Sequence, residues 1–189
     1  PGASSLNPTA ATDLMRITLA LLLLAAAPAR GQYLADTGRS DPAEDFYRAG
    51  EKAYRAGDHA TAIAAYTQAI ALQPGHVNAL LHRGFCHSLA KRYEAAAADF
   101  SAVIETKPDH ALAYLSRGSA YAKLGRHSEA IADFDRVSAL EPRNAEALNN
   151  RGWSRKAQGD QAGACKDWKE SKRLGNAEAR IILENNRCK

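Results

Sequence analysis

The chain has 189 residues, of which 46% are hydrophobic, and its formal net charge is +4 at neutral pH. This composition supplies enough apolar side chains for one sizeable core and excludes a chain that is disordered throughout. The modest positive charge is weak evidence for a nucleic-acid partner, because acidic and basic residues are interspersed after residue 40, as on a solvated helical surface.

The first residues contain a targeting pattern. Residues 1–14 show no hydrophobic period and precede Met15, so we interpret them as a leader that is non-native or wrongly assigned. After Met15, the basic residue Arg16 is followed by an apolar run from Ile17 to Ala27, in which only Thr18 is polar. A positive residue before such a run is typical of a secretory signal peptide, and the run is shorter than the ~20 residues that span a bilayer.

We expect the signal peptide to comprise residues 15–31. Small residues at the end of the apolar run favour cleavage after Ala29 or after Gly31. Residues 32–41 are then expected to form a polar linker. The pattern predicts a periplasmic or secreted protein that has no membrane span after cleavage.

The remainder of the chain, residues 42–189, is organised by a repeat of 34 residues. A glycine, an alanine, an aromatic residue and a proline each recur at this spacing. They are Gly50, Gly84, Gly118 and Gly152; Ala62, Ala96, Ala130 and Ala164; Tyr66, Phe100, Phe134 and Trp168; and Pro74, Pro108 and Pro142. A fixed period of this length predicts stacked pairs of helices.

The period divides this region into four units and a cap. The units comprise residues 43–76, 77–110, 111–144 and 145–178, and a capping helix is expected at 177–187. Each unit should contain two helices, with a turn between them and a proline or asparagine after the second. A glycine inside a helix costs ~1 kcal/mol relative to alanine, so the recurring glycines predict a close approach of the two helices in each unit.

These positions resemble the tetratricopeptide repeat. Residues 111–144 match its pattern of small and aromatic positions best, with only Val137 larger than usual; the matching residues are Gly118, Tyr121, Gly125, Ala130, Phe134 and Pro142. The resemblance implies an all-α fold, a right-handed α-solenoid of four helix-turn-helix repeats plus the capping helix. The closing segment, from Gly163 to Trp168 and then Leu174-Gly175 and Cys188, is similar to that of exported bacterial members of this family.

The three cysteines fall into two groups. Cys165 and Cys188 lie on the last two expected helices, so they either form a disulfide that holds the cap to the last repeat or remain free thiols. We favour the disulfide in an oxidising compartment, where it would contribute ~3 kcal/mol. Cys86 takes the small, packed position that Ala120 takes in the next unit, and we interpret it as a buried, inert thiol.

No catalytic pattern is evident, and we expect neither an enzyme nor a cofactor. The chain has no Gly-rich phosphate loop, no His-Glu-x-x-His and no nucleophile elbow. His82 and Cys86 would share a helix face, but a third metal ligand is missing, so no metal site is expected. Asp99 and Asp133 are interpreted as part of solvated helix faces, although their recurrence with Asp167 at the 34-residue period indicates a structural role.

The resemblance implies that the first helix of each unit lines a concave groove. Carried over to this chain, the groove residues are Tyr47, Arg48, Glu51, Tyr54, Asn78, His82, Phe85, Leu115, Ser119, Asn149, Asn150 and Trp153, with Glu44, Arg55, Leu81, Leu89, Leu112, Ser116, Lys123 and Lys156 in the wider groove. This mixture of aromatic and polar side chains suits an extended peptide or a partner helix. Alternatively, aromatic residues such as Phe85 and Trp153 close the groove by packing on neighbouring helices.

One function of the family can be argued against. The carboxylate clamp that binds chaperone C-termini uses Lys, Asn and Arg, and the matching positions here hold Tyr47, Glu51, His82, Leu112 and Ser116. We therefore predict a non-enzymatic scaffold that binds a protein or peptide ligand rather than a small-molecule substrate. The alternatives are a helical-repeat nucleic-acid binder, favoured only by a pI near 9.0, and an accessory subunit of an envelope enzyme or transport complex.

Overall fold

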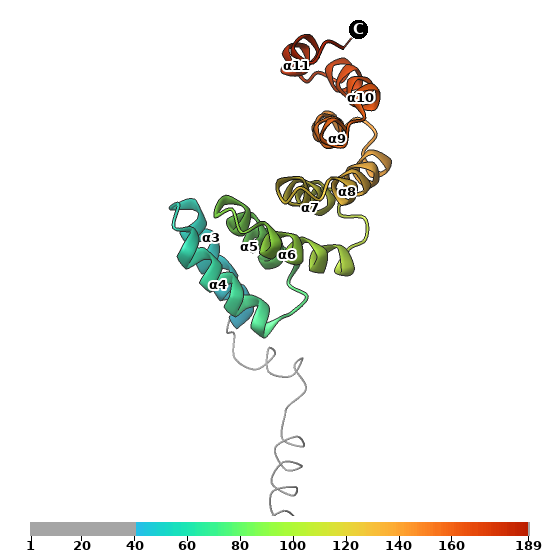
Figure 1. Cartoon of the computed structure of the whole chain (residues 1–189). Coiled ribbons are helices and arrows are strands. Elements are labelled where there is room, and N and C mark those ends of the chain that lie inside the picture. Colours follow the sequence, from blue (N-terminus) through green and yellow to red (C-terminus); the bar gives the residue numbers. More distant parts are fainter. Residues whose placement is uncertain (1–40, 189) are drawn as a thin grey trace, which may run out of the picture. The chain divides into compact units, whose positions relative to one another are not determined.

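The computed structural model describes residues 41–188, which form nine helices and no strand (Figure 1). The predicted leader, signal peptide and linker lie outside these residues, apart from Asp41. The helices are α3 (Pro42–Arg55), α4 (His59–Leu72), α5 (Val77–Leu89), α6 (Tyr93–Thr106), α7 (Ala111–Lys123), α8 (His127–Leu140), α9 (Ala145–Ala157), α10 (Gln161–Arg173) and α11 (Ala179–Asn185). None of these described helices is long and apolar enough to cross a membrane.

The helices pack as consecutive pairs, α3 with α4, α5 with α6, α7 with α8, and α9 with α10. The second helix of each pair also contacts the first helix of the next, and α10 contacts α11. In addition, the first helices touch one another in series, α3 with α5, α5 with α7, and α7 with α9. The predicted all-α fold of packed helix pairs is confirmed, and the first helices share one face of the array.

Polar side chains at the turns start most of the helices. His76, His110 and Asn144 precede the first helices of units two to four, and each accepts a hydrogen bond from the backbone N–H three residues later, at 3.2, 3.2 and 2.9 Å. Asp58 and Asp160 accept equivalent bonds at the start of α4 and α10, at 3.0 and 2.8 Å. A cap of this kind satisfies one backbone donor that the helix itself cannot pair.

The aromatic residues of the 34-residue period form the centre of each pair. Tyr66, Phe100, Phe134 and Trp168 are fully buried. A Cβ atom added to the glycine of the opposing helix would lie 2.5 to 2.8 Å from the nearest ring atom in all four pairs. Glycine is therefore needed for the close approach, as the sequence predicted.

A ladder of ion pairs runs between the helices. Arg83, Arg117 and Arg151 bind Asp99, Asp133 and Asp167 through two nitrogens each, with the shortest contact of each pair at 2.6, 2.7 and 2.6 Å. The remaining guanidinium nitrogen of each arginine binds the preceding pair, at Thr67, Ser101 and Asp135 respectively. The ladder thus joins each unit internally and to the unit before it.

The interpretation of Asp99 and Asp133 as solvated is wrong, because each is only 5% exposed. They have the structural role that the 34-residue period indicated, as partners of the ladder arginines. The partner arginines recur at the same 34-residue spacing, which is the signal that would have revealed the pairs.

The last helix is held to the last pair by a covalent bond. Cys165 of α10 and Cys188 form a disulfide with their Cα atoms 5.4 Å apart. Beside it, the side-chain amide of Gln161 donates to the carbonyl of Asn186 at 3.0 Å. Helix α11 is shorter than the 177–187 expected from the sequence, because the Asn176 side chain accepts from the Glu178 amide and extends the turn.

Candidate functional site

The first-helix face is closed by its own side chains at the N-terminal end. The His82 ring stacks between Tyr47 and Tyr54, with centroids 5.8 and 6.1 Å away and interplanar angles of 10° and 9°. Glu51 Oε1 lies 2.7 Å from His82 Nδ1 and also accepts a 3.0 Å hydrogen bond from the Tyr66 hydroxyl. These predicted groove residues therefore join α3 to α5 rather than offering open polar groups.

The electrostatics of this cluster keep the phenols of Tyr47 and Tyr66 neutral. Burial, followed by the hydrogen bond to Glu51 and its charge, raises the pKa of Tyr66 far above its usual value. Burial and the charge of Glu51 also raise the pKa of Tyr47. Tyr66 remains a hydrogen-bond donor to Glu51 across the physiological pH range, so the cluster is a stable polar joint.

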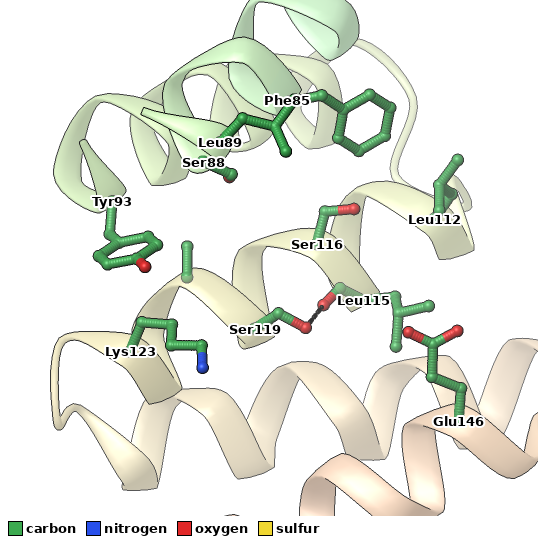
Figure 2. A pocket seen from close by; sticks show the side chains of 11 residues that line it. Phe85, Ser88, Leu89, Tyr93, Leu112, Leu115, Ser116, Ser119, Lys123 and Glu146 are labelled. Atoms are coloured by element: carbon green, nitrogen blue, oxygen red, sulfur yellow. Dashed lines mark hydrogen bonds between the residues drawn. The ribbon is translucent and has the colours of Figure 1, made fainter. Parts of the chain in front are cut away.

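Farther along the same face, α5 and α7, with Tyr93 of α6 and Glu146 of α9, line an open, largely apolar pocket of about 440 Å³ (Figure 2). Its apolar wall comes from Phe85 and Leu89 of α5 and from Leu112 and Leu115 of α7. Leu89 is 57% exposed and Leu112 is 45% exposed, so large apolar groups face solvent here. Phe85 also packs against the buried ring of Phe100 at 5.5 Å, which fixes its position.

Charged and hydroxyl groups border this pocket. Figure 2 shows Lys123 at the end near Tyr93, and Glu146 at the opposite end near Leu115. Within residues 41–188, neither the side chain of Lys123 nor that of Glu146 makes a hydrogen bond or an ion pair with another residue. Ser119 lies between them and donates to the carbonyl of Leu115 at 2.9 Å.

A second pocket, of about 330 Å³, adjoins the first and shares Ser119 and Lys123 with it. Helix α9 contributes Asn150 and Trp153, and Trp153 is 44% exposed. The Trp153 ring is held edge-on against buried Trp168, with centroids 5.0 Å apart. An exposed aromatic ring fixed by packing is a typical anchor for a partner protein.

Most of the predicted groove residues fall into three sets, and Ser119 belongs to two of them. Tyr47, Glu51, Tyr54 and His82 form the closed joint; Phe85, Leu115 and Ser119 line the first pocket; and Ser119, Asn150 and Trp153 line the second. The others line neither pocket. Arg48 pairs with Glu44 at 3.0 Å, Asn78 is exposed near the turn, and the backbone carbonyl of Asn149 accepts from Trp168.

Sequence reasoning missed Tyr93, His127 and Glu146 as pocket residues. The repeat contained the signal for all three. Tyr93 and His127 begin the second helices of adjacent units, and Glu146 is one period after Leu112. Phe85 and Trp153 combine the two roles that the sequence left open, because each packs on a buried ring and also lines a pocket.

Within the described part of the chain, we looked for side chains that could bind a metal ion, act as a nucleophile or bind phosphates. No cluster of three metal-binding side chains occurs among residues 41–188. Cys86 is buried, and burial raises the pKa of its thiol to about 11, so the thiol stays protonated and unreactive. Three basic side chains of the array, Arg83, Arg117 and Arg151, are neutralised by aspartates and are poorly suited to bind phosphates.

Comparison with known proteins places this geometry among helical repeats. The tetratricopeptide repeat family model matches residues 47–111, 90–140 and 115–170. No curated protein sequence matches the chain. Among solved structures, the first repeat domain of Spaghetti (RPAP3) bound to the HSP90 peptide SRMEEVD is 27% identical, with a TM-score of 0.61, and the match covers 64% of this chain and 96% of that chain.

Two further structures show the same fold. The OM64 repeat domain of Arabidopsis is 29% identical, with a TM-score of 0.58 and coverage of 61% of this chain and 95% of that chain. MamA from Desulfovibrio magneticus RS-1 is 23% identical, with a TM-score of 0.68 and coverage of 73% and 77%. The similarity to MamA, at 23% identity, shows the fold alone.

Proposed function

The chain belongs to the tetratricopeptide repeat family, and we propose that it is a non-enzymatic scaffold that binds a peptide segment of a partner protein. The binding surface is the face of α5, α7 and α9 that carries the two adjoining pockets. The observation that carries the proposal is the exposure of Leu89, Leu112 and Trp153 around these pockets. Full burial of a large apolar side chain contributes about 1.5 to 3 kcal/mol, and these three are about half exposed, so a peptide that covers them gains roughly half of this from each.

The comparison with the RPAP3 domain supports a peptide ligand, because that domain was solved with a peptide bound. The ligand of the present protein must differ from a chaperone C-terminus. Two of the positions that match the carboxylate clamp hold the uncharged residues Leu112 and Ser116, and a third, Glu51, is acidic. An acidic side chain at that place repels a terminal carboxylate.

We propose in addition that the protein is exported to the periplasm or secreted. The signal pattern of residues 15–31 supports this location. The geometry of Cys165 and Cys188 also supports it, because a structural disulfide persists in an oxidising compartment and is rare in the cytosol.

Site-specific photo-crosslinking tests the binding surface. A benzoylphenylalanine is placed at Leu112 in the pocket, and in a second protein at Ala98, an exposed position of α6 that lines neither pocket. Both purified proteins are irradiated in an extract of the host cell envelope. We expect a discrete partner to be cross-linked from position 112 and not from position 98.

Charge variants complete the test. Leu112→Asp should abolish capture of that partner, and Ala98→Asp, the same type of change at an exposed helical position, should leave it intact. Circular dichroism verifies that both variants remain helical. Equal cross-linking from the two positions, or undiminished capture by Leu112→Asp, would show that binding lies elsewhere.

A further inference from the structure

We infer that the pocket face selects an extended peptide with a fixed order of charges: a basic residue, a large apolar residue and an acidic residue, each two positions apart, followed by an aromatic residue. This inference rests on the proposed function and adds the class of ligand. It is carried by the unpaired charges Lys123 and Glu146, which border one apolar pocket from opposite ends (Figure 2).

Charge complementarity gives the order. The arginines of the interhelical ladder are neutralised inside the protein, but Lys123 and Glu146 have no ionic partner within residues 41–188. Glu146 therefore attracts a basic ligand residue at its end of the pocket, and Lys123 attracts an acidic one at the other end. The wall formed by Phe85 and Leu89 lies between them and receives an apolar side chain.

The helix geometry gives the spacing. Leu112, near the Glu146 end, and Lys123 are eleven residues apart on α7, which corresponds to ~16 Å along the helix axis. An extended chain rises ~3.3 Å per residue and directs every second side chain to the same side. Two ligand residues four positions apart therefore span ~13 Å, and their long charged side chains cover the remainder.

The floor of the pocket favours an extended backbone over a helix. Within residues 41–188 the hydroxyl of Ser116 has no hydrogen-bond partner, and that of Ser119 uses its proton on the Leu115 carbonyl and keeps its acceptor sites. An extended peptide brings unpaired backbone N–H and C=O groups to these hydroxyls, whereas a helix has already paired its own.

The second pocket extends the motif beyond the acidic residue. Lys123 and Ser119 belong to both pockets, so a ligand residue two positions past the acid reaches Trp153 and Asn150. A ring in this position packs against the exposed indole face, which the contact with Trp168 holds in place.

Defined peptides test the inference. The probes are Lys-Ser-Leu-Ser-Glu-Ser-Phe and its reverse, Phe-Ser-Glu-Ser-Leu-Ser-Lys, both blocked at their termini, because the chain direction is not set by the charges. Their controls have the Lys and Glu exchanged, or both replaced by Gln. Isothermal titration with the purified protein at low salt measures affinity. A change in tryptophan fluorescence that is lost in a Trp153→Phe variant reports occupancy of the second pocket, because Trp168 also emits.

We expect one of the two probes to bind about tenfold more tightly than its charge-exchanged control. The exchanged peptide either meets two like charges at partly exposed sites or binds in the opposite direction and loses the aromatic contact with Trp153. The double variant Lys123→Glu/Glu146→Lys should reverse this preference. Lys166→Glu, a charge change on α10 away from both pockets, should leave it as it is.

The inference is overturned if the Gln peptides bind as tightly as the charged ones, if the double variant keeps the parent's preference, or if no probe binds. These outcomes are separate from the proposed function, which the cross-linking from position 112 decides. If a partner is cross-linked from position 112 but the peptide affinities do not depend on charge order, the binding face stands and only the predicted ligand class is refuted.

Discussion

Replacement of Gly84 by alanine tests the close helix packing on which the whole array depends. A Cβ atom at this position would lie 2.6 Å from Cε1 and 2.9 Å from Cζ of Phe100. Carbon atoms in good contact are about 3.5 to 4.0 Å apart, so the ring or the helix must move by roughly 1 Å. Phe100 is fully buried in a core cluster that includes Leu81 and Val103, and its ring packs on Phe85 with centroids 5.5 Å apart, so neighbouring side chains must move with it.

The expected free energy change follows from two opposing effects. Overpacking of a filled core costs about 1 to 3 kcal/mol, and a 1 Å overlap with a fixed ring places this change at the upper end. Alanine in a helix interior is better than glycine by ~1 kcal/mol. We therefore expect Gly84→Ala to destabilise the protein by about 2 kcal/mol, whereas helix propensity alone predicts stabilisation.

Urea unfolding followed by circular dichroism measures the change, and Gly75→Ala is the matched control. A Cβ added to Gly75 meets nothing within 4 Å and its backbone does not have positive φ, so this variant should be neutral or slightly stabilised. Replacing the ring by the smaller side chain in Phe100→Leu should reduce the destabilisation caused by Gly84→Ala. A Gly84→Ala protein at least as stable as the parent would refute the packing argument.

Three further predictions concern the interior and the cap. Arg117→Met should lower the free energy of unfolding by about 3 kcal/mol, because it leaves the Asp133 carboxylate buried without its partner. Adding Asp133→Leu should recover most of this loss. A double-mutant cycle in which the two costs simply add would contradict the ion-pair ladder. Replacing Cys165 and Cys188 by serine should lower the free energy of unfolding by about 3 kcal/mol, and reductant should have this effect on the parent but not on the variant. Burial lowers the pKa of His87 below its ordinary value of 6.5, so protonation favours the unfolded chain and stability is lost as the pH falls below that value. His87→Gln should therefore show a smaller difference between urea midpoints at about pH 5 and about pH 7.5 than the parent does.

Much of the fold was accessible from the sequence because its causes are local. The small and aromatic residues at a 34-residue period predicted the helix pairs, and the turn residues between them predicted the helix ends within a few positions. One turn breaks the pattern, since Lys91 has a positive φ of 58° at the place where Gly57, Gly125 and Gly159 have φ values of 77°, 75° and 87°. The turn still forms, because the helices on both sides of it pack as in the other units.

The candidate site was only partly accessible. The repeat pattern named the face but could not show which of its side chains are already paired. Tyr47 and His82 lie 35 residues apart and meet because α3 packs beside α5, which removes them from the open surface. Nothing in their local sequence distinguishes them from Phe85 and Trp153, which remain available in the pockets.

The sequence by itself therefore determined the helices, their pairing and the face that the first helices share, because periodicity and turn chemistry act over short stretches of chain. Only the tertiary structure decided which charges are neutralised. Arg117 finds Asp133 on the neighbouring helix, whereas Lys123 and Glu146 face the same pocket without an ionic partner among residues 41–188. Electrostatic pairing depends on distances of a few ångströms between separate helices, and such distances are set by packing rather than by position in the sequence.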